Sequence, residues 1–525
     1  MILRIHDASR VTSIEYTAPA LLSSLFSQHG TGCEMPCGGQ RRCLKCRVTV
    51  RGGALPPDAR EASLLTDAEL AAGVRFACMT TLTGDADVTL PHHGVMRIQT
   101  AGSTREVSPE PWAPSVNASG DAGFGAAIDI GTTTMAGYLY RLSDGALLAS
   151  DSLPNPQGRF GADVVTRIER SLGGDAEALA AAVREGANEL LARLCTAAGV
   201  DSAETGAVVF TGNTAMLYLL TERNPYALSR SPFEADELFG LYCTPESLGL
   251  CTPNAKIYLM RSISAFVGGD ITAGILSSSL CEGNMPRLLV DIGTNGEMAL
   301  WDGKKLLCCA TAAGPAFEGA GISQGCTARE GAICRVTLEG GQIAVQTVGD
   351  APADGICGSG LLDALAAFTK LGLVDETGCI DEDADEEGYV TADGDLRVGS
   401  TQVLFTQKDV RAVQLAKSAI CSGLETLLET AGLTADDLDA VYLAGGFGTV
   451  LNPASAEAIG LLPKGFAAKT VAVGNAAGMG AAAVLRNRTL LAESERLAHA
   501  GETVPLAENP VFMEKFVENM MFPEA

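Results

Sequence analysis

A near-duplicated segment limits the possible folds of this chain more than any other feature. Residues 127–141, AIDIGTTTMAGYLYR, match residues 289–303, LVDIGTNGEMALWDG, almost position by position. Each copy has an apolar strand, a DIGT turn and a second strand, which is the pattern of a β-hairpin. Long-range repetition of such a unit indicates structural duplication. We therefore expect two related subdomains that face one cleft.

The segments around the two copies predict a layered α/β architecture. Strand-like AAIDI, AVVF, LLVDI and AVYLA alternate with helical patterns such as DAEALAAAVREGANELLARLCTAAG. Such alternation is typical of sheets that are covered by helices. Hydrophobic residues make up 47% of the chain and charged residues 19%, as in compact globular proteins. A chain of 525 residues is too long for a single hydrophobic core, so we expect two to four domains.

A change of composition divides the chain at residues 101–124. This stretch holds three prolines and many Ser and Gly residues, which interrupt any hydrophobic period, so we predict a linker. Before it, CRVTV and DVTL alternate in the manner of short strands, with LLSSLF as a helical turn. We expect a small domain over 1–100, one subdomain over 125–284, and a second over 285–525 that includes a C-terminal tail.

The charge balance excludes some classes of partner. The formal net charge of −26 disfavours nucleic-acid backbones and anionic lipid surfaces as main partners, because both would be repelled. The first residues, MILRIHDASR, lack the layout of a signal peptide, and no apolar run reaches the length of a membrane helix. We expect a cytoplasmic protein that does not contact a membrane.

Five of the 16 cysteines lie in the first 78 residues. In CGGQRRCLKC and beyond, gaps of 5, 2 and 31 residues separate Cys37, Cys43, Cys46 and Cys78. Three close thiolates and one distant thiolate suit a [2Fe-2S] cluster, which needs four ligands and a loop that wraps it closely. Alternatives are a four-cysteine zinc site or inert thiols. Cys33 could replace Cys37 as a ligand, but only Cys37 gives the ferredoxin gap.

The two DIGT turns are candidate phosphate sites. Asp129 and Asp291 each end an apolar strand, where a carboxylate can hold Mg²⁺ or orient water. Glycine lets the backbone approach phosphate and offer its N–H groups, and the hydroxyl and amide side chains beside it can join them. The candidate phosphate-binding residues are Gly131, Thr132 and Thr133 in the first turn, and Gly293, Thr294 and Asn295 in the second.

Two further segments complete the candidate site. In AVYLAGGFG, Gly445 and Gly446 follow a buried strand and leave a flat surface for a purine ring, with Phe447 beside them. In AGPAFEG, Glu318 either orients a water for attack on a γ-phosphate or makes a structural hydrogen bond to the glycine-rich loop.

These motifs resemble known families. DIGTTT, DIGTNGE, LAGGFG and GNAAGMGAA resemble, in order, the motifs of the actin, sugar-kinase and heat-shock ATPase superfamily over residues 125 to about 490. That resemblance implies a duplicated ribonuclease H-like ATPase fold that uses ATP with Mg²⁺. The cysteine spacing resembles adrenodoxin-like ferredoxins, which implies a β-grasp domain, although relatives usually carry glycine where Arg41 and Leu44 stand.

The combination resembles the reductive activators of corrinoid-dependent enzymes. NPQGRFGADVVTRI, TGNTAM, AGPAFEGAGI, DGICGSGLLDAL and TQKDVRAVQLAKSAI resemble stretches of that family. The resemblance implies an ATP-dependent one-electron transfer from the cluster to a corrinoid protein of a methyltransferase system, converting cob(II)alamin to cob(I)alamin. It also implies an upstream low-potential reductant and is compatible with a homodimer.

Two other functions remain open at the level of sequence. A small-molecule kinase with a fused ferredoxin domain would carry a catalytic base in the cleft. An activator of a radical or dehydratase enzyme would resemble the 2-hydroxyacyl-CoA dehydratase activators, which share a cluster between subunits through cysteines of the ATPase fold. The five histidines do not include the Asp-x-His-x-x-Gly arrangement of many corrinoid-binding domains, so we expect the corrinoid on another protein.

Overall fold

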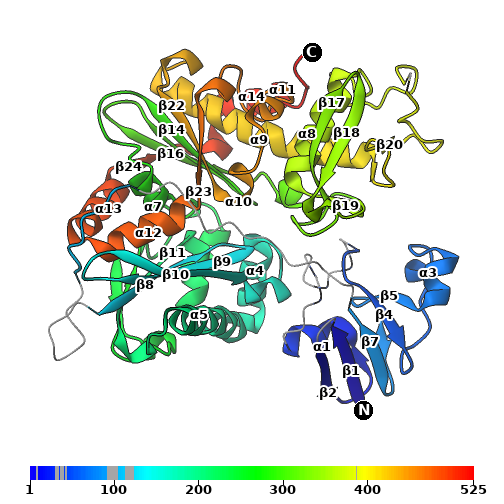
Figure 1. The fold of residues 1–525 in the computed structure, drawn as a ribbon, viewed down its shortest axis with the longest axis horizontal. Helices are drawn as coiled ribbons and strands as arrows, with labels where there is room; N and C mark the ends of the chain where they lie inside the picture. The colour runs from blue at the N-terminus through cyan, green and yellow to red at the C-terminus, as the bar shows by residue number, and fades with distance from the viewer. Residues whose placement is uncertain are drawn as a thin grey trace.

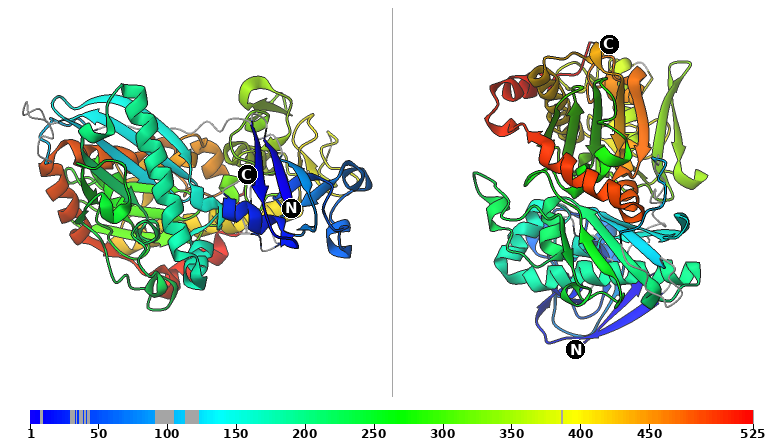
Figure 2. Two further views of the ribbon diagram at one scale, coloured as in Figure 1. Left: turned by 90° about the horizontal axis from the view of Figure 1, so that it is seen from below. Right: turned by 90° about the vertical axis from the view of Figure 1, so that its left-hand side faces the viewer.

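The structure is a computed structural model that describes residues 1–7, 10–29, 33, 35, 39, 41, 44–90, 105–112, 123–385 and 387–524. A small N-terminal domain, blue in Figure 1, is followed by two larger α/β lobes. The N-terminal domain lies beside the first lobe and below an outer part of the second lobe (Figure 1). The right-hand view of Figure 2 shows the two lobes one above the other.

The N-terminal domain is a mixed five-stranded sheet with the order β2-β1-β7-β4-β5. Strands β1 and β7 are parallel and the other pairs are antiparallel. Helix α1 packs Leu22, Leu25 and Phe26 into the core, which gives the predicted β-grasp arrangement. The elements are β1 Ile2–Asp7, β2 Arg10–Glu15, β3 Ala20–Leu21, α1 Leu22–His29, β4 Arg47–Arg51, α2 Ala59–Ala62, α3 Asp67–Ala72, β5 Val74–Phe76, β6 Thr81–Leu82 and β7 Ala86–Thr89.

A buried ion pair ties α2 to β5 just before Cys78. Glu61 is fully buried and accepts hydrogen bonds from Arg75 Nε at 3.0 Å and Nη2 at 2.7 Å. The backbone N–H of Phe76 donates to the same carboxylate at 2.8 Å. Because the buried carboxylate and guanidinium are both hydrogen-bonded, the ion pair fixes the end of β5. It thereby also fixes the turn that carries Cys78.

The first lobe contains a six-stranded sheet with the order β10-β9-β8-β11-β13-β12. Strands β8, β9 and β10 form an antiparallel meander, and β11 and β13 continue the sheet in parallel with β8. The long helix α5 covers the face opposite the second lobe (Figure 1). The elements are β8 Phe124–Ile130, β9 Thr134–Arg141, β10 Ala146–Pro154, α4 Val164–Arg170, α5 Ala176–Ala198, β11 Thr205–Gly212, α6 Thr214–Leu220, β12 Leu241–Cys243 and β13 Lys256–Leu259.

The second lobe repeats this topology with the order β23-β22-β14-β15-β16-β24. The meander β14–β15–β16 is again followed by parallel strands, here β22 and β23, so the sequence repeat corresponds to a duplicated ribonuclease H-like unit. Helix α9 takes the place of α5. The elements are β14 Arg287–Ile292, β15 Gly296–Trp301, β16 Leu306–Thr311, α9 Gln407–Ala431, β22 Ala440–Ala444, α10 Gly445–Gly448, α11 Pro453–Ala458, β23 Thr470–Gly474 and β24 Gly501–Thr503.

Two helices of small residues form the seam between the sheets. Helix α7 (Gly269–Ser277) packs on α12 (Ala476–Arg486), and both contribute to a core that takes residues from each lobe. A Cβ atom at Gly480 would lie 2.0 Å from the carbonyl oxygen of Ala273, so only glycine allows this approach. The seam brings the tips of the two meanders together.

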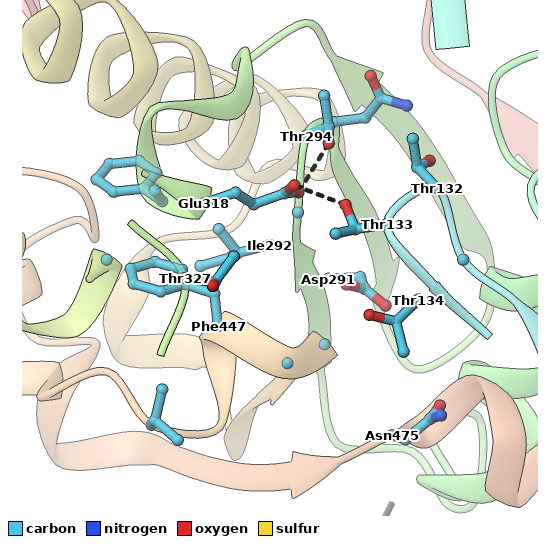
Figure 3. A pocket seen from close by; sticks show the side chains of 18 of the residues that line it. Thr132, Thr133, Thr134, Asp291, Ile292, Thr294, Glu318, Thr327, Phe447 and Asn475 are labelled. Carbon is cyan, nitrogen blue, oxygen red and sulfur yellow. Dashed lines mark hydrogen bonds between the residues drawn. The ribbon is translucent and has the colours of Figure 1, made fainter. Parts of the chain in front are cut away.

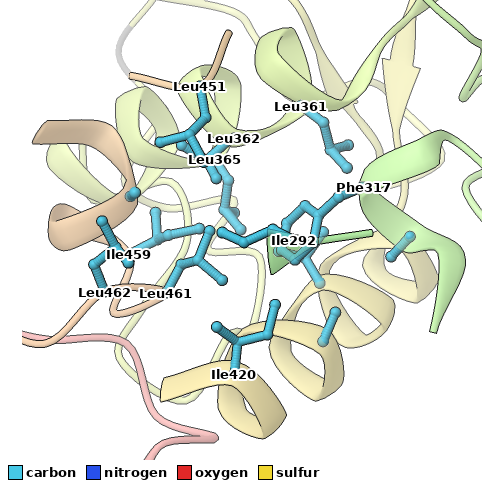
Figure 4. Close-up of a cluster of buried hydrophobic side chains, with 14 of the residues drawn as sticks. Ile292, Phe317, Leu361, Leu362, Leu365, Ile420, Leu451, Ile459, Leu461 and Leu462 are labelled. Carbon is cyan, nitrogen blue, oxygen red and sulfur yellow. The ribbon is translucent and has the colours of Figure 1, made fainter. Parts of the chain in front are cut away.

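An outer part of the second lobe supports the floor of the cleft. Its elements are β17 Ala332–Glu339, β18 Gln342–Thr347, β19 Gly355–Ile356, α8 Gly358–Lys370, β20 Leu396–Arg397 and β21 Leu404–Phe405. Side chains from these and neighbouring elements form one apolar cluster, in which Ile292 and Phe317 meet Leu361 of α8 and Ile420 of α9 (Figure 4). The cluster therefore fixes the end of β14, and with it the second DIGT turn.

The C-terminal residues are tied to α9 by a buried lysine. Helix α13 (Arg488–Ala500) leads through β24 to α14 (Pro510–Glu518), which packs on α9. The ammonium group of Lys417, 1% exposed, donates to the carbonyl oxygens of Asn519 and Met521, each at 2.6 Å. Burial lowers the pKa of Lys417 to about 8.

Residues 105–112, inside the stretch predicted as a linker, pack on the body of the protein. The indole N–H of Trp112 donates to the carbonyl oxygen of Val484 at 3.0 Å, and Glu110 pairs with Arg488. Strand β8 begins at Phe124. The described part of this stretch is thus fixed to α12 and α13. Among the described residues, no helix is both long enough and apolar enough to span a membrane.

Candidate nucleotide and cluster sites

A pocket of about 360 Å³ opens between the two DIGT turns (Figure 3). Its wall takes residues from both lobes, and the turns between β8 and β9 and between β14 and β15 face each other across it. All twelve residues that the sequence proposed for nucleotide binding and catalysis line this pocket: Asp129, Gly131, Thr132, Thr133, Asp291, Gly293, Thr294, Asn295, Glu318, Gly445, Gly446 and Phe447.

Each turn has an internal hydrogen bond from the N–H of its glycine. The N–H of Gly131 donates to the carbonyl oxygen of Thr134 at 2.9 Å, and the N–H of Gly293 donates to that of Asn295 at 3.0 Å. A Cβ atom at Gly131 would lie 2.7 Å from the Thr134 oxygen, so a side chain would open the first turn. The tight turns leave the hydroxyl groups of Thr133 and Thr294 directed into the cleft (Figure 3).

Glu318 joins the two turns. It ends the short 3₁₀ helix Pro315–Glu318, and its two carboxylate oxygens accept one hydrogen bond from each lobe. Thr133 Oγ1 donates to Oε2 at 2.7 Å, and Thr294 Oγ1 donates to Oε1 at 2.7 Å (Figure 3). The sequence proposed a role for Glu318 at the γ-phosphate or at the glycine-rich loop. In the structure its carboxylate bridges the hydroxyl groups of both turns.

Besides Glu318, four carboxyl groups lie along the pocket wall, and two of them, Asp270 and Glu297, were not predicted from the sequence. Burial, opposed by a hydrogen bond from Asn475 and aided by the charge of Asp291, raises the pKa of Asp129 to about 7. Burial raises the pKa of Asp291 to about 6, and burial together with Asp291 and Asp129 raises that of Asp270 to about 8. Burial also raises the pKa of Glu297 well above its usual value.

This carboxyl cluster suits a cation that is brought by a nucleotide. Repulsion between buried carboxylates is relieved when a positive charge enters. Within the described ranges, no three His, Cys, Asp or Glu side chains converge closely enough to hold a metal ion by themselves. Mg²⁺ typically takes one or two carboxylates together with substrate phosphates and waters, so the chemistry of the wall fits a Mg²⁺–nucleotide complex.

Buried polar residues hold the first DIGT turn and the carboxyl group of Asp129 in position. The guanidinium of Arg167, 1% exposed, donates from Nη2 to the carbonyl oxygen of Thr132 at 2.6 Å. Burial lowers the pKa of Arg167 to about 10, which leaves it protonated at neutral pH. Asn155 donates to the carbonyl oxygen of Gly131 at 2.8 Å, and Asn475 donates to Asp129 at 3.0 Å. None of these three supporting residues was predicted from the sequence as part of the site.

The glycines of AGGFG form part of the pocket wall. A Cβ atom at Gly445 would lie 2.4 Å from Asp291 Oδ1, so the approach of this carboxylate also favours glycine here. Gly446 has open space in front of it. The rings of Phe447 and Phe317 stack with centroids 5.0 Å apart and an interplanar angle of 9°. The stacked pair provides a flat apolar surface at the pocket.

The candidate cluster site is described in part. Cys37 and Cys43 lie outside the described residues. Cys46 and Cys78 are both 1% exposed, with their Sγ atoms 3.3 Å apart, and the N–H of Cys78 points to Cys46 Sγ at 3.5 Å. Cys33 is buried in the same core.

The paired thiols fit two ligands of one metal atom. A metal–thiolate bond of roughly 2.3 Å in a tetrahedral centre places two sulfur atoms about 3.8 Å apart, close to the observed separation. Arg41 and Leu44, at positions where ferredoxin relatives usually have glycine, adopt φ values of 61° and 56°. The loop therefore keeps its left-handed turns with ordinary side chains, each at a cost of about 1 kcal/mol.

Comparison with known proteins agrees with this architecture. The family model described as the C-terminal domain of RACo, the ASKHA domain, matches residues 285–525, and the model described as the RACo middle region matches residues 124–282. The corrinoid activation enzyme RamQ of Eubacterium limosum is 34% identical over 423 residues, which cover 76% of this chain and 70% of RamQ.

Two further similarities extend the comparison. The reductase of the Co(II) methylated amine-specific corrinoid protein of Methanosarcina barkeri is 31% identical over 266 residues, 46% of this chain and 45% of the reductase. A solved structure titled as a reductive activator for a corrinoid, iron-sulfur protein has a TM-score of 0.69 and 29% identity, and the match covers 99% of this chain and 98% of that one.

The fold and pocket define an ATPase of the ASKHA class, preceded by a β-grasp domain. Within that class, the chain belongs to the family of reductive activators of corrinoid proteins.

Proposed function

We propose that this protein uses ATP to drive one electron at a time onto the cobalt of a partner corrinoid protein, converting cob(II)alamin to cob(I)alamin. The observation that carries the proposal is that one chain holds both parts of such a device. A nucleotide-type pocket lies between duplicated hairpins, and a buried thiol pair lies in a ferredoxin-like domain. The activities in the names of its family relatives support the same reaction.

The cluster ligands in this proposal are Cys37, Cys43, Cys46 and Cys78. When bound, a [2Fe-2S] cluster supplies a one-electron donor. The chain's own contribution is to bury two of these thiols and to fix their approach through the Glu61–Arg75 ion pair. An upstream low-potential reductant restores the electron after each transfer. The corrinoid belongs to a separate protein, which is the substrate of the reaction.

ATP is needed because the electron transfer runs uphill. Ferredoxin-type clusters have potentials near about −400 mV, and a corrinoid cobalt of still lower potential accepts their electron only at a cost. A gap on the order of 100 mV corresponds to about 2.3 kcal/mol for one electron. A nucleotide-dependent shape change can supply this amount if it favours a complex in which the cobalt is easier to reduce.

In the cleft, each residue has a proposed role. The N–H groups and hydroxyls of the two DIGT turns bind the phosphates, and Asp129 and Asp291 hold Mg²⁺ through its waters or directly. The stacked Phe447 and the open face of Gly446 receive the purine. Once the threonine hydroxyls turn to phosphate, the Glu318 carboxylate is available to orient the attacking water.

The test is anaerobic reduction of a partner corrinoid protein, followed by its absorbance. With a low-potential reductant and Mg²⁺, we expect cob(I)alamin to form in the presence of ATP and not in its absence. Asp291→Ala should abolish both ATP hydrolysis and reduction while the visible spectrum of the cluster stays unchanged. Removal of residues 1–100 should stop reduction and preserve ATP binding.

Three results would contradict the proposal. Equal reduction of the corrinoid with and without ATP would show that electron transfer is not coupled to ATP. Phosphorylation of a small molecule in place of cobalt reduction would favour a kinase. Tightly bound zinc, found by metal analysis of anaerobically purified protein, would exclude the ferredoxin interpretation.

A further inference from the structure

One lysine of the N-terminal domain reaches the segment that carries Glu318. Lys45 lies between two candidate cluster ligands in the sequence CLKC. Its ammonium group donates to the carbonyl oxygen of Ile322 at 3.0 Å and to that of Gly325 at 3.1 Å. These partners are 277 and 280 positions away, so the contact joins the cluster loop to the wall of the nucleotide pocket.

The segment between Glu318 and the two carbonyl groups is built as one rigid loop. A Cβ atom at Gly319 would lie 2.6 Å from the backbone nitrogen of Cys326, so the two ends of the loop touch. Ser323 donates from its backbone N–H to the buried carboxylate of Asp409 at 2.7 Å. Because the two ends of the loop touch, a backbone displacement at Glu318 can pass directly to the carbonyl groups that Lys45 binds.

A second contact links the N-terminal domain to the other lobe. Ser27 Oγ of α1 donates to the carbonyl oxygen of Arg159 at 3.3 Å. Arg159 ends the 3₁₀ helix that begins after Asn155, and Asn155 is bonded to the first DIGT turn. The N-terminal domain therefore contacts both lobes, in each case one element away from a phosphate turn.

Binding of phosphate competes with the bridge made by Glu318. Thr133 and Thr294 each have one hydroxyl proton, and both protons are donated to the Glu318 carboxylate. A phosphate oxygen can accept from these hydroxyls only after they leave Glu318, and an anionic phosphate repels that carboxylate. The bridge that a phosphate must break thus belongs to the loop that Lys45 binds, which is also anchored through Ser323 to Asp409.

We propose that Lys45 is the positioning residue through which the nucleotide controls the ferredoxin-like domain. With the Glu318 bridge intact, Lys45 holds the cluster loop against the cleft. Phosphate binding breaks the bridge, shifts the loop and releases the domain, so that its cluster can approach the partner. The inference rests on the proposed function and adds the residue that couples its two halves. Since coupling is reciprocal, Lys45 also lowers the affinity for nucleotide.

The test measures nucleotide affinity in the full-length protein with its cluster. Titration with a non-hydrolysable ATP analogue and Mg²⁺ should show that Lys45→Met binds about three- to tenfold more tightly than the wild type, from the loss of two hydrogen bonds. Lys45→Arg, which keeps a cationic donor, should return toward the wild-type value. Arg51→Met, on the exposed end of β4 in the same domain, is the matched control and should stay within about twofold.

A second measurement follows the contact itself. Lys45 is the only lysine in the first 100 residues. Its acylation by an amine-directed reagent, measured by mass spectrometry of the peptide that contains it, should increase severalfold when the analogue is added. Unchanged reactivity would overturn the proposed release.

The outcomes separate this inference from the proposed function. If the wild type binds no nucleotide, both are overturned. If the wild type binds nucleotide and reduces its partner, but Lys45→Met binds with unchanged or weaker affinity, only the role of Lys45 is overturned. Tighter binding by Lys45→Met, with rescue by Lys45→Arg and an unchanged control, supports the inference.

Discussion

Asp129→Asn should stabilise the protein against unfolding while it abolishes its use of ATP. The substitution removes one charge from the carboxyl cluster and keeps nearly the same shape. The amide oxygen of the new side chain can still accept the hydrogen bond that Asn475 now donates to Asp129 at 3.0 Å. The predicted gain therefore reflects the removal of a buried charge rather than a loss of packing.

The size of the effect follows from the pKa of Asp129. Burial, and to a lesser degree the charge of Asp291, raises this pKa from 3.8 to about 7. A carboxyl group with a raised pKa in the folded state contributes stability below pH 4, and this contribution is lost as the pH rises through about 7. At about 1.4 kcal/mol for each pH unit, this loss amounts to about 2 kcal/mol near pH 5.5, where the folded protein still holds the proton, and to about 4 kcal/mol near pH 8, where the buried group is ionised.

The assay is thermal unfolding of both proteins in a chelator, without nucleotide, at these two pH values. The advantage of Asp129→Asn should grow with pH and reach on the order of 10 °C near pH 8. Mg²⁺ with ATP should then stabilise the wild type and not the variant. Equal melting temperatures near pH 8, or an advantage that does not change with pH, would refute the electrostatic reasoning.

Three shorter predictions concern the cluster, the seam and the C-terminal residues. Cys46→Ser should lose the iron-sulfur cluster, whereas Cys33→Ser should keep about two irons per chain. Iron and sulfide content and visible absorbance would measure both. Loss of the cluster in both variants would show that Cys33 is also a ligand. Gly480→Ala should lower the unfolding free energy by about 3 kcal/mol, since the new Cβ would meet the Ala273 carbonyl, and an unchanged denaturation midpoint would contradict this. Lys417→Met should cost about 2 kcal/mol, because two carbonyl groups lose the donor that the buried lysine supplies, and unfolding in urea would detect or disprove this.

The duplicated fold could be predicted because its information is local. Each copy of the repeat contains two strands and their turn within fifteen residues, and the structure confirms both hairpins as β8–β9 and β14–β15. The β-grasp fold was likewise expected from cysteine spacing and short alternating strands. Arg41 and Leu44 were noted as departures from glycine, and the structure explains how the loop accepts them, through left-handed φ values.

The rest of the cleft could not be read from sequence, because it depends on tertiary placement. Asp270 lies in the first turn of α7, outside both DIGT motifs, and reaches the pocket because the seam brings α7 between the sheets. Glu297 could have been found from the sequence, because it is a charged residue inside an otherwise apolar strand. Arg167 lies in a segment that resembled the family, but nothing local shows that its guanidinium holds the first turn.

The contacts proposed to couple the nucleotide pocket to the N-terminal domain are the least local of all. Glu318 is 185 positions from Thr133 and only 24 from Thr294, yet it bonds both hydroxyls at the same distance of 2.7 Å. A nucleotide that separates those hydroxyls from Glu318 acts on both lobes at once, because each lobe supplies one donor. The N-terminal domain also contacts both lobes, through Ser27 and Lys45. A relative movement of the lobes would change the separation of these two contacts, and this is how the position of the domain would respond to the nucleotide in the proposed coupling.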